Sequence, residues 1–598
     1  MQMPNEDSRK RQRREQEQKQ QSKNSRNLQS QDDINSSKNR LLVTEDGSRA
    51  QCELVGLNPF SSTLKVLSYE NALAMQLAIR HLNEGNGSLV SELTDLPNSC
   101  PITFSASFAD TRQNQNYAFS VVDDMTLPQG IENNKTDAVL PCAFVGAIDS
   151  AVSKTTALVT GLRDFPQISP GSSASSLNSP DDFPLFGRTI PDDSFAAEIF
   201  VRFLHDEIGI RHFFVIFEPH PYTESILNSL RDAIRNLGWA PQQENDESGF
   251  MYMEEKIIPS KSPVILTEAI EALRASEFRF VVSLTREQGT TDALMEIAYE
   301  QGMAGNPISS YHWWFFGETL QGALNNPRFS KDSNLVKAYD GVGSIGRTDE
   351  KGVKHENFLQ QSSELKRELY IEYDNIGDSQ KWLFAPEAPF LNEDEWFLEG
   401  SDFSFDTASF TYDATVLLGL SACHSVSGTS LSGAEDTRPS LFLAGKDYFE
   451  IIKRTNFTGL TGEILLDRQT GTRDGDSIKY NINNWLLSDS DDNDSNENTT
   501  NTAMFRSIDT HEYAPGGDDN WEELKPYFFN GGKSKTSLGS NPGLAPVNVT
   551  YNEVDMWLIV LSALCCTTIV MMAIGCSIWV CRKKDSPVVR ASQPVSQV

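Results

Sequence analysis

Cysteine, basic residues and long apolar runs are all scarce in this chain. Its 8 cysteines among 598 residues are too few for a fold held together by disulfides. Acids outnumber bases by 83 to 51, giving a formal net charge of −32. This charge argues against a body that binds nucleic acid, because phosphates require a basic face. Hydrophobic residues still make up 38% of the chain, which is enough for a sizeable core.

Motifs for catalysis and metal binding are also missing. The sequence has no His-Glu-x-x-His, no Gly-x-Ser-x-Gly, no phosphate-binding loop and no Cys-x-x-Cys. The 8 histidines lack the spacing of metal ligands, and the acidic run at 488–498 lacks the glycine and glutamate of a calcium loop. We therefore expect no enzyme activity, no metal and no cofactor.

One uncharged run near the C-terminus differs from the rest of the chain. Residues 556–581 carry no charge and are long enough, as a helix, to cross a bilayer core of about 30 Å. Trp557 and Trp579 lie near its ends, and Arg582 begins a basic cluster after it. This pattern predicts one transmembrane helix, with 582–598 as a short cytoplasmic tail and the large N-terminal part extracellular or luminal.

The first 45 residues differ in composition from everything that follows. Residues 1–45 are polar and basic, which predicts a disordered tail. They contain no apolar stretch of the kind that a signal peptide needs. An extracellular body therefore implies either a start upstream of this sequence or insertion directed by the span itself.

An extracellular location affects the cysteines and asparagines of the body. Cys52, Cys100, Cys142 and Cys423 would lie in an oxidising compartment, and four cysteines allow three pairings. Cys100 and Cys142 each adjoin a strand-like run, so we predict a disulfide between them; four free thiols are the alternative. Candidate N-glycosylation sites are Asn86, Asn134, Asn456, Asn493, Asn498 and Asn548.

Between residues 50 and 545, short apolar runs alternate with amphipathic helical segments. The runs ELVGLNPF, PITFSASFAD, AVLPCAFVGAI and FPQIS predict strands, and helical patterns lie between them. Such a series predicts a parallel sheet with helices on both faces. A second series begins after residue 190 with HFFVIF and FRFVVSL. We therefore predict two lobes, the first at about 50–190 and 340–470 and the second at about 191–335 and 475–540.

The order of these segments resembles a known receptor region. The resemblance is carried by AFVGAIDSAVS, FPQISPGSSASSL, DFPLFGRTIPDDSFAAEIFV, FEPHPYTESI, SFTYDATVLLGLSAC and FTGLTGEILLDRQTG. Together they resemble, over nearly all of 50–485, the extracellular ligand-binding region of class C G-protein-coupled receptors and natriuretic-peptide receptors. The resemblance implies an α/β fold, a bilobed clamshell similar to type I periplasmic binding proteins, with two parallel-sheet lobes and ligand between them. It also implies a homo- or heterodimer through the first lobe.

The resemblance also implies ligand residues on both lobes. On the first lobe these are Ser150, at a helix start whose free N–H groups suit a carboxylate, and Ser172 and Ser173 on the loop after FPQIS. On the second lobe Tyr222 matches an aromatic residue that packs over an amino-acid ligand. The alternatives are that Ser150 only caps its helix and that Ser172 and Ser173 are ordinary loop residues.

The stretch YHWWFFGE departs from the family members that bind glutamate. Those members place an acid there for the ligand's amine, whereas this chain offers Trp313 and Trp314. This is closer to the GABA type B branch, where a tryptophan in this stretch packs against the ligand. The final segment, CRKKDSPVVRASQPVSQV, resembles the first cytoplasmic loop of that branch, so a truncated seven-span receptor is an alternative.

These observations predict a single-span membrane receptor that binds an amino acid or small anion between two extracellular lobes. One alternative is a membrane-tethered solute-binding protein that serves a transporter, because the fold is shared. The other is an adhesion or partner-binding ectodomain with a vestigial groove.

Overall fold

The structure is a computed structural model. It describes residues 49–62, 64–127, 140–240, 250–305, 312–317, 324, 333–348, 352–374, 405–426, 445–487, 505–514, 521–525, 528–529 and 533–534. The predicted tail at 1–45, the predicted span at 556–581 and the tail at 582–598 lie outside these residues. Among the helices that the structure describes, none combines the length and apolarity needed to span a membrane.

The first lobe is built on a sheet of five parallel strands in the order β2-β1-β3-β4-β5. The strands are β1 (Ala50–Asn58), β2 (Ile102–Asp110), β3 (Ala143–Gly146), β4 (Gln167–Ser169) and β5 (Phe186–Arg188). All five coincide with apolar runs of the sequence or directly follow one. The predicted parallel sheet is therefore confirmed for this lobe.

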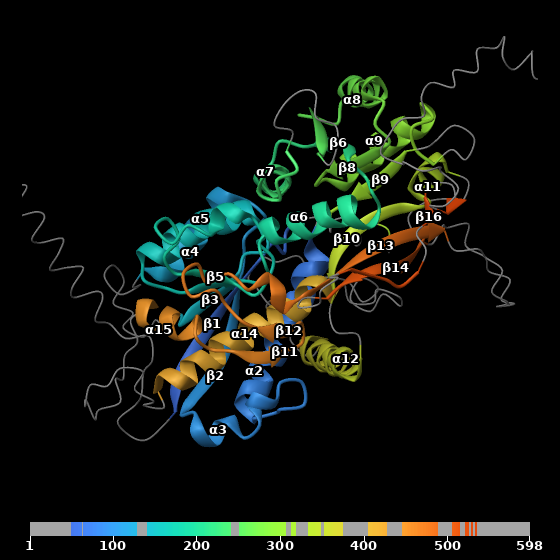
Figure 1. Cartoon of the computed structure of the whole chain (residues 1–598). Coiled ribbons are helices and arrows are strands. Elements are labelled where there is room, and N and C mark those ends of the chain that lie inside the picture. Colours follow the sequence, from blue (N-terminus) through green and yellow to red (C-terminus); the bar gives the residue numbers. More distant parts are fainter. Residues whose placement is uncertain are drawn as a thin grey trace, which may run out of the picture. The chain divides into compact units, whose positions relative to one another are not determined.

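Helices cover both faces of the first sheet. Leu54 of β1 packs in one apolar cluster with α2 (Lys65–Glu84) and α14 (Phe405–Val426), which lie side by side in Figure 1. Val55, the next residue, packs on the opposite face in a cluster with α4 (Gln115–Thr126) and α5 (Ser150–Leu162). Successive strand residues point to opposite faces, so residues 54–57 of β1, which are buried on both faces, form a continuous apolar run.

The second lobe contains a larger, mixed sheet in the order β15-β14-β13-β10-β9-β8-β6-β7. Strands β6 to β10 are parallel, as predicted, but β13, β14 and β15 are antiparallel. The prediction of an all-parallel sheet is therefore wrong for this part, because an apolar run does not encode the direction of a strand. The strands are β6 (His212–Phe217), β7 (Tyr252–Ile257), β8 (Phe280–Leu284), β9 (Trp313–Phe316), β10 (Val342–Thr348), β13 (Lys479–Leu487), β14 (Phe505–Tyr513) and β15 (Trp521–Glu523).

The position of β10 also corrects a predicted lobe boundary. The sequence prediction assigns residues from about 340 onward to the first lobe, but β10 lies inside the second sheet between β9 and β13. The chain returns to the first lobe at α12 (Val353–Asp374), where Glu368 pairs with Arg80 of α2 at 2.7 Å. The boundary was misplaced because β10 finds its antiparallel partner, β13, more than 130 residues further along the chain.

Helices of the second lobe also lie on both sides of their sheet. One apolar cluster joins the sheet to α6 (Asp193–Arg202) and α7 (Pro221–Asn236). The other joins it to α8 (Pro263–Ser276) and α9 (Gln288–Glu300). The remaining elements are α3 (Leu96–Ser99), α11 (Asn334–Tyr339), α15 (Gly445–Ile452), β11 (Phe457–Gly459), β12 (Gly462–Ile464), β16 (Phe528–Phe529), β17 (Lys533–Ser534) and short 3₁₀ and π segments.

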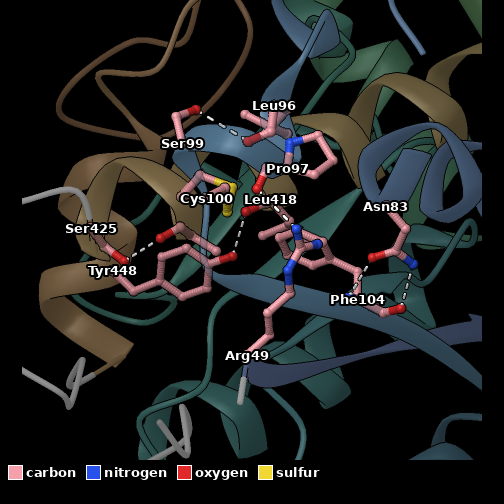
Figure 2. The surroundings of a disulfide bond; sticks show 12 residues. Arg49, Asn83, Leu96, Pro97, Ser99, Cys100, Phe104, Leu418, Ser425 and Tyr448 are labelled. Carbon is pink, nitrogen blue, oxygen red and sulfur yellow. Dashed lines mark hydrogen bonds between the residues drawn. A yellow bond between two sulfur atoms is a disulfide. The ribbon is translucent and has the colours of Figure 1, made fainter. Parts of the chain in front are cut away.

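Two disulfides lie in the first lobe, and neither is the predicted Cys100–Cys142 pair. Cys142 precedes β3 and pairs with Cys52 of β1, with a Cα–Cα distance of 5.4 Å. Cys100 precedes β2 and pairs with Cys423 of α14, with a Cα–Cα distance of 5.1 Å (Figure 2). The predicted pairing is wrong because β1 lies between β2 and β3 in the sheet. The two cysteines are therefore on strands that are not neighbours.

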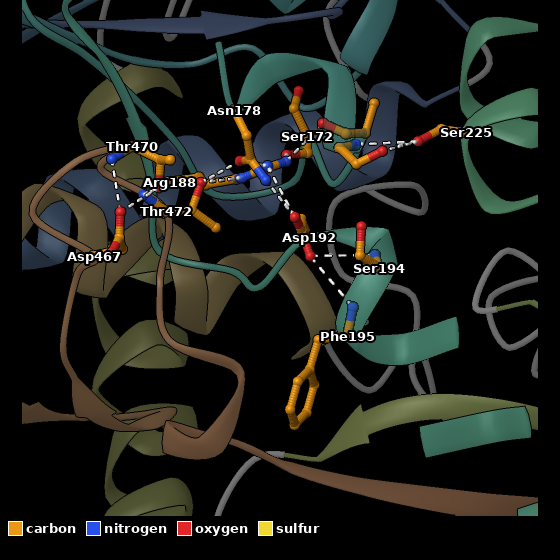
Figure 3. Close-up of polar contacts among 12 residues, drawn as sticks. Ser172, Asn178, Arg188, Asp192, Ser194, Phe195, Ser225, Asp467, Thr470 and Thr472 are labelled. Atoms are coloured by element: carbon orange, nitrogen blue, oxygen red, sulfur yellow. Dashed lines mark hydrogen bonds and ion pairs between the residues drawn. The ribbon is translucent and has the colours of Figure 1, made fainter. Parts of the chain in front are cut away.

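Two buried arginines, Arg188 and Arg473, donate hydrogen bonds between the segments that connect the lobes. The Arg188 guanidinium, at the end of β5, donates to Ser172 O at 2.9 Å and to Thr472 Oγ1 at 3.1 Å (Figure 3). Arg473 donates to Thr189 O at 3.1 Å. Burial lowers the pKa of Arg188 to about 10, so this side chain remains charged at neutral pH. These bonds fix the chain just before it enters α6.

Candidate functional site

A cavity of about 60 Å³, the interlobe cavity, lies where α6 and α7 face the carboxyl ends of β8, β9 and β10. This is where parallel α/β sheets bind their ligands. The second lobe supplies most of the lining, and Ser173 contributes from the first lobe. The remaining lining residues are Pro191, Asp192, Asp193, Ala196, Ala197, Phe200, Tyr222, Ile226, Leu230, Val282, Leu284, Phe315, Phe316, Gly317, Ile345, Arg347 and Tyr480.

Two adjacent acids at the start of α6 have different roles. Asp192 caps the helix: its Oδ1 accepts from Ser194 N at 3.2 Å and from Phe195 N at 3.3 Å. The next residue, Asp193, is only 6% exposed, and its backbone N–H donates to Ser173 O at 2.9 Å. Its carboxylate atom Oδ2 is buried and accepts no hydrogen bond from any residue that the structure describes. Asp192 is therefore a capping residue, whereas Asp193 has free bonding capacity.

The surroundings of Asp193 set its charge. Burial raises the pKa of Asp193 from 3.8 to about 6, and the hydroxyls of Ser173 and Ser225 and the charge of Arg188 act against this rise. The carboxyl group is therefore largely ionised at neutral pH in spite of its burial. A buried carboxylate with an unpartnered oxygen is costly, and a cation or another strong donor would relieve that cost. The site is thus suited to a ligand that carries an ammonium group.

Two of the six predicted ligand residues line this cavity. Ser173 reaches it from the loop that follows β4, and Tyr222 reaches it from the first turn of α7. The backbone of Tyr222 is held by its N–H, which donates to His220 Nδ1 at 3.2 Å. The structure therefore brings one predicted residue from each lobe to the same cavity as Asp193.

Ser150 and Ser172 lie close by but do not line the cavity. Ser150 Oγ accepts from Ala174 N at 3.3 Å, and Ser172 is fully buried, with its Oγ 3.0 Å from Ala147 O. Asp149 caps α5, accepting from Ala151 N at 2.9 Å and from the next N–H. The helix N–H groups that a ligand carboxylate would use are thus partly occupied. Both serines have local bonding roles within the first lobe.

The two predicted tryptophans are core residues of the second lobe. Trp314 is fully buried and donates from Nε1 to Met303 O at 2.8 Å, and Trp313 is 5% exposed in the cluster on the other face of the sheet. Neither lines the interlobe cavity. Phe315 and Phe316, the next two residues of β9, line it instead, because they lie at the carboxyl end of the strand.

Residues that the sequence prediction missed complete the site. Asp193 stands in the segment TIPDDSF, which carries part of the family resemblance, and its position at a helix start was the available signal. Arg347, on β10, is the single basic residue among the described residues that line the cavity. No local sequence pattern indicated Arg347, and the sequence prediction placed its strand in the first lobe.

Direct contacts join the lobes beside the cavity. The Arg286 guanidinium of the second lobe lies 2.5 Å from Asp149 Oδ2 of the first lobe. Ser175 N of the first lobe donates to Ser225 Oγ of α7 at 3.1 Å. The Asp149 carboxylate thus caps α5 and holds Arg286 at the same time. These contacts place the N-termini of α5 and α7 close to the same interlobe region.

Two predicted glycosylation sites fall on described residues. Asn456 is exposed and Asn86 is partly exposed. Asn456 therefore has the surface accessibility that a glycan needs, and Asn86 has it in part. The other four candidates, Asn134, Asn493, Asn498 and Asn548, lie outside the described residues.

The fold and cavity define a two-lobed α/β ligand-binding protein, consistent with the type I periplasmic-binding-like fold. The chain belongs to the receptor family ligand binding region, whose family model matches residues 70–487. This confirms the family predicted from the sequence. The chain is also similar to the G-protein coupled receptor family C group 6 member A of Carassius auratus, with 29% identity over 158 residues. That match covers 25% of this chain and 17% of the receptor, so the chain aligns with only a small part of it.

Proposed function

We propose that this chain is the ectodomain of a membrane receptor and binds a small amino-acid-like ligand between its two lobes. The observation that carries the proposal is Asp193, a buried carboxylate with one unpartnered oxygen that lines the interlobe cavity. A ligand ammonium would supply the missing donor, and such charge-assisted bonds are stronger than neutral ones.

The other polar groups at the cavity fit the remainder of an amino acid. Arg347 is the basic partner for the ligand carboxylate, because a guanidinium binds a carboxylate through two parallel hydrogen bonds. Ser173 supplies a hydroxyl from the first lobe and Tyr222 an aromatic ring from the second. A ligand held by both lobes favours the arrangement in which they are close, which is how binding would become a signal.

Ligand binding by the full chain tests this proposal. We expect at least one amino acid of a panel to raise the midpoint of thermal unfolding, since a ligand at 100 times its Kd stabilises by about 2.7 kcal/mol. Asp193→Asn should weaken that ligand at least tenfold in calorimetric titration. Asp232→Asn, an exposed acid on α7 that also carries one negative charge, is the matched control. Equal affinity in wild type and Asp193→Asn would contradict the proposed site.

We also propose that the chain dimerises through its first lobe. Phe119 of α4 and Leu158 and Leu162 of α5 are exposed by 46%, 46% and 85%, and the two helices pack against each other. Exposed apolar side chains grouped in this way are typical of protein interfaces. Leu162→Glu should therefore shift the full chain toward monomer in light scattering. Val264→Glu on α8 of the second lobe, at a residue 66% exposed, should not.

A further inference from the structure

The interlobe cavity combines polar groups at the starts of α6 and α7 with a mostly apolar lining. We infer that the ligand carries an apolar side chain of intermediate length, which enters the second lobe between α6, α7 and the sheet. This inference rests on the proposed function, because it names the class of amino acid that the same site accepts. Leucine, isoleucine and methionine belong to this class.

The orientation of two helices separates these polar groups from part of the apolar lining. Asp193 is the first residue of α6 and Tyr222 is the second residue of α7, so both polar groups lie where the helices begin. Phe200 and Leu230 line the same cavity seven and eight residues later. At about 1.5 Å per residue these positions are about 10–12 Å further along each helix. An amino acid whose ammonium lies at Asp193 would therefore point its side chain along α6 and α7.

Five side chains of the lining offer no partner for a polar group. They are those of Ala197, Phe200, Leu230, Val282 and Phe315, and all are at most 4% exposed. None of these side chains has a nitrogen or oxygen atom. A ligand amide, hydroxyl or charge placed among them would lose its water without gaining a hydrogen bond. Apolar atoms would instead gain contacts and leave water on binding.

The volume of the cavity limits the size of the ligand. The 60 Å³ is shared by the ligand's ammonium group, its carboxylate and its side chain. The indole of tryptophan, with nine ring atoms, is therefore disfavoured, whereas glycine has no side chain to contact the apolar lining. The cavity therefore selects side chains of intermediate length.

Titration of the full chain with a graded series of ligands tests the inference. The series is glycine, alanine, 2-aminobutyrate, norvaline, leucine, phenylalanine, glutamine, glutamate and lysine. We expect affinity to rise about fourfold for each added methylene up to leucine, and the three polar residues of similar length to bind at least tenfold more weakly than leucine. Glycine or glutamate binding as tightly as leucine would overturn the inference.

Variants of the cavity wall provide the second arm. Ala197→Leu fills the cavity, so leucine should lose at least tenfold in affinity while glycine and alanine keep theirs. Should that variant fail to fold, Ile226→Ala enlarges the cavity at a half-buried position and should shift the preference toward longer side chains. Ile257→Ala, on an exposed residue of β7, is the matched control and should leave the preference unchanged.

The outcomes separate the two proposals. Binding by no member of the series overturns both the proposed function and this inference. Binding that does not follow side-chain length, or an Ala197→Leu variant that weakens glycine as much as leucine, overturns the inference alone. A graded series whose optimum moves with the cavity variants supports both.

Discussion

At the residue scale, Asp193 illustrates a conflict between stability and binding. Its carboxylate is buried next to apolar side chains, and one of its oxygens has no partner among the described residues. Such groups destabilise a fold and are found where a function requires them. The neighbouring Asp192 shows the opposite case, because its carboxylate caps α6. Two adjacent residues of the same type thus differ in role because only one of them points its charge at helix N–H groups.

The raised pKa of Asp193 predicts how stability depends on pH. The folded protein holds this proton up to about pH 6, whereas the unfolded chain releases it near 3.8, so the free energy of unfolding falls as pH rises between these values. Above pH 6 the full cost is present. Asp193→Asn should therefore raise the free energy of unfolding by about 1–3 kcal/mol at pH 7.5, and by clearly less at pH 4.5. Urea unfolding of ligand-free protein at both values checks this.

The control for that experiment is the exposed acid of α7 used above. Asp232→Asn should change the free energy of unfolding by less than about 0.5 kcal/mol at either pH, because exposed charges contribute little. A difference between wild type and Asp193→Asn that is the same at pH 4.5 and 7.5 would show that the carboxyl is not strained by burial.

At the element scale, the amphipathic helices are where sequence prediction succeeds best. Leu227, Leu230 and Ile234 of α7 are buried as their spacing predicts, and Gly238 after the helix has φ +75°, a conformation that favours glycine. The six apolar runs predicted to be strands correspond to β1, β2, β3, β4, β6 and β8, but the other strands and the pairing partners were not predicted. Pairing depends on residues far apart in sequence, as β10 and β13 show.

The cysteines follow the same rule, and their pairing gives a prediction. Cys100–Cys423 joins the start of β2 to α14 across a sequence separation of 323 residues. Cys100→Ala should lower the free energy of unfolding by about 2–5 kcal/mol, since the bond restricts the unfolded chain. Cys423→Ala and the double variant should lower it by the same amount, because all three lose one bond.

Proteolytic peptides from the non-reduced protein should contain Cys52 with Cys142 and Cys100 with Cys423; a peptide joining Cys100 to Cys142 would contradict the structure.

The ligand residues show why a strand sequence alone does not define a site. Trp313, Trp314, Phe315 and Phe316 form one apolar run, and all four are buried. The resemblance to the GABA type B branch, where a tryptophan packs against the ligand, led the prediction to the first two. The cavity is lined by the last two, because only the carboxyl end of β9 reaches it. The sequence of an apolar run that is buried on both faces does not indicate which of its ends lines the cavity.

At the scale of the whole molecule, the residues matched by the family model form most of the two lobes. The family match over 70–487 and the two sheets describe the same body, and the match to a class C receptor supports our proposal of an extracellular location. That proposal predicts that Asn456, an exposed sequon residue in the first lobe, carries a glycan when the chain is made in a eukaryotic secretory pathway. Digestion with an N-glycosidase should increase mobility on a gel.

Single-site variants assign the glycan. Asn456→Gln should remove one glycosidase-sensitive band, whereas Asn483→Gln, a buried asparagine of β13 outside any sequon, should not. Unmodified Asn456 in protein recovered from the secretory pathway would count against glycosylation at this position. Loss of a band in both variants would show that the change reflects folding rather than the sequon.

The sequence by itself determined the family, the alternation of strands and helices, the presence of two lobes and two residues of the interlobe cavity, Ser173 and Tyr222. The alternation and the lobes follow from local patterns of apolar spacing, whereas the family and the two cavity residues follow from the resemblance that short motifs in a fixed order carry. Only the tertiary structure decided which cysteines pair, which strands run antiparallel, where the second lobe ends and which acid faces the cavity. Each of these depends on segments far apart in the chain that meet only when the sheets form, so no local pattern encodes them.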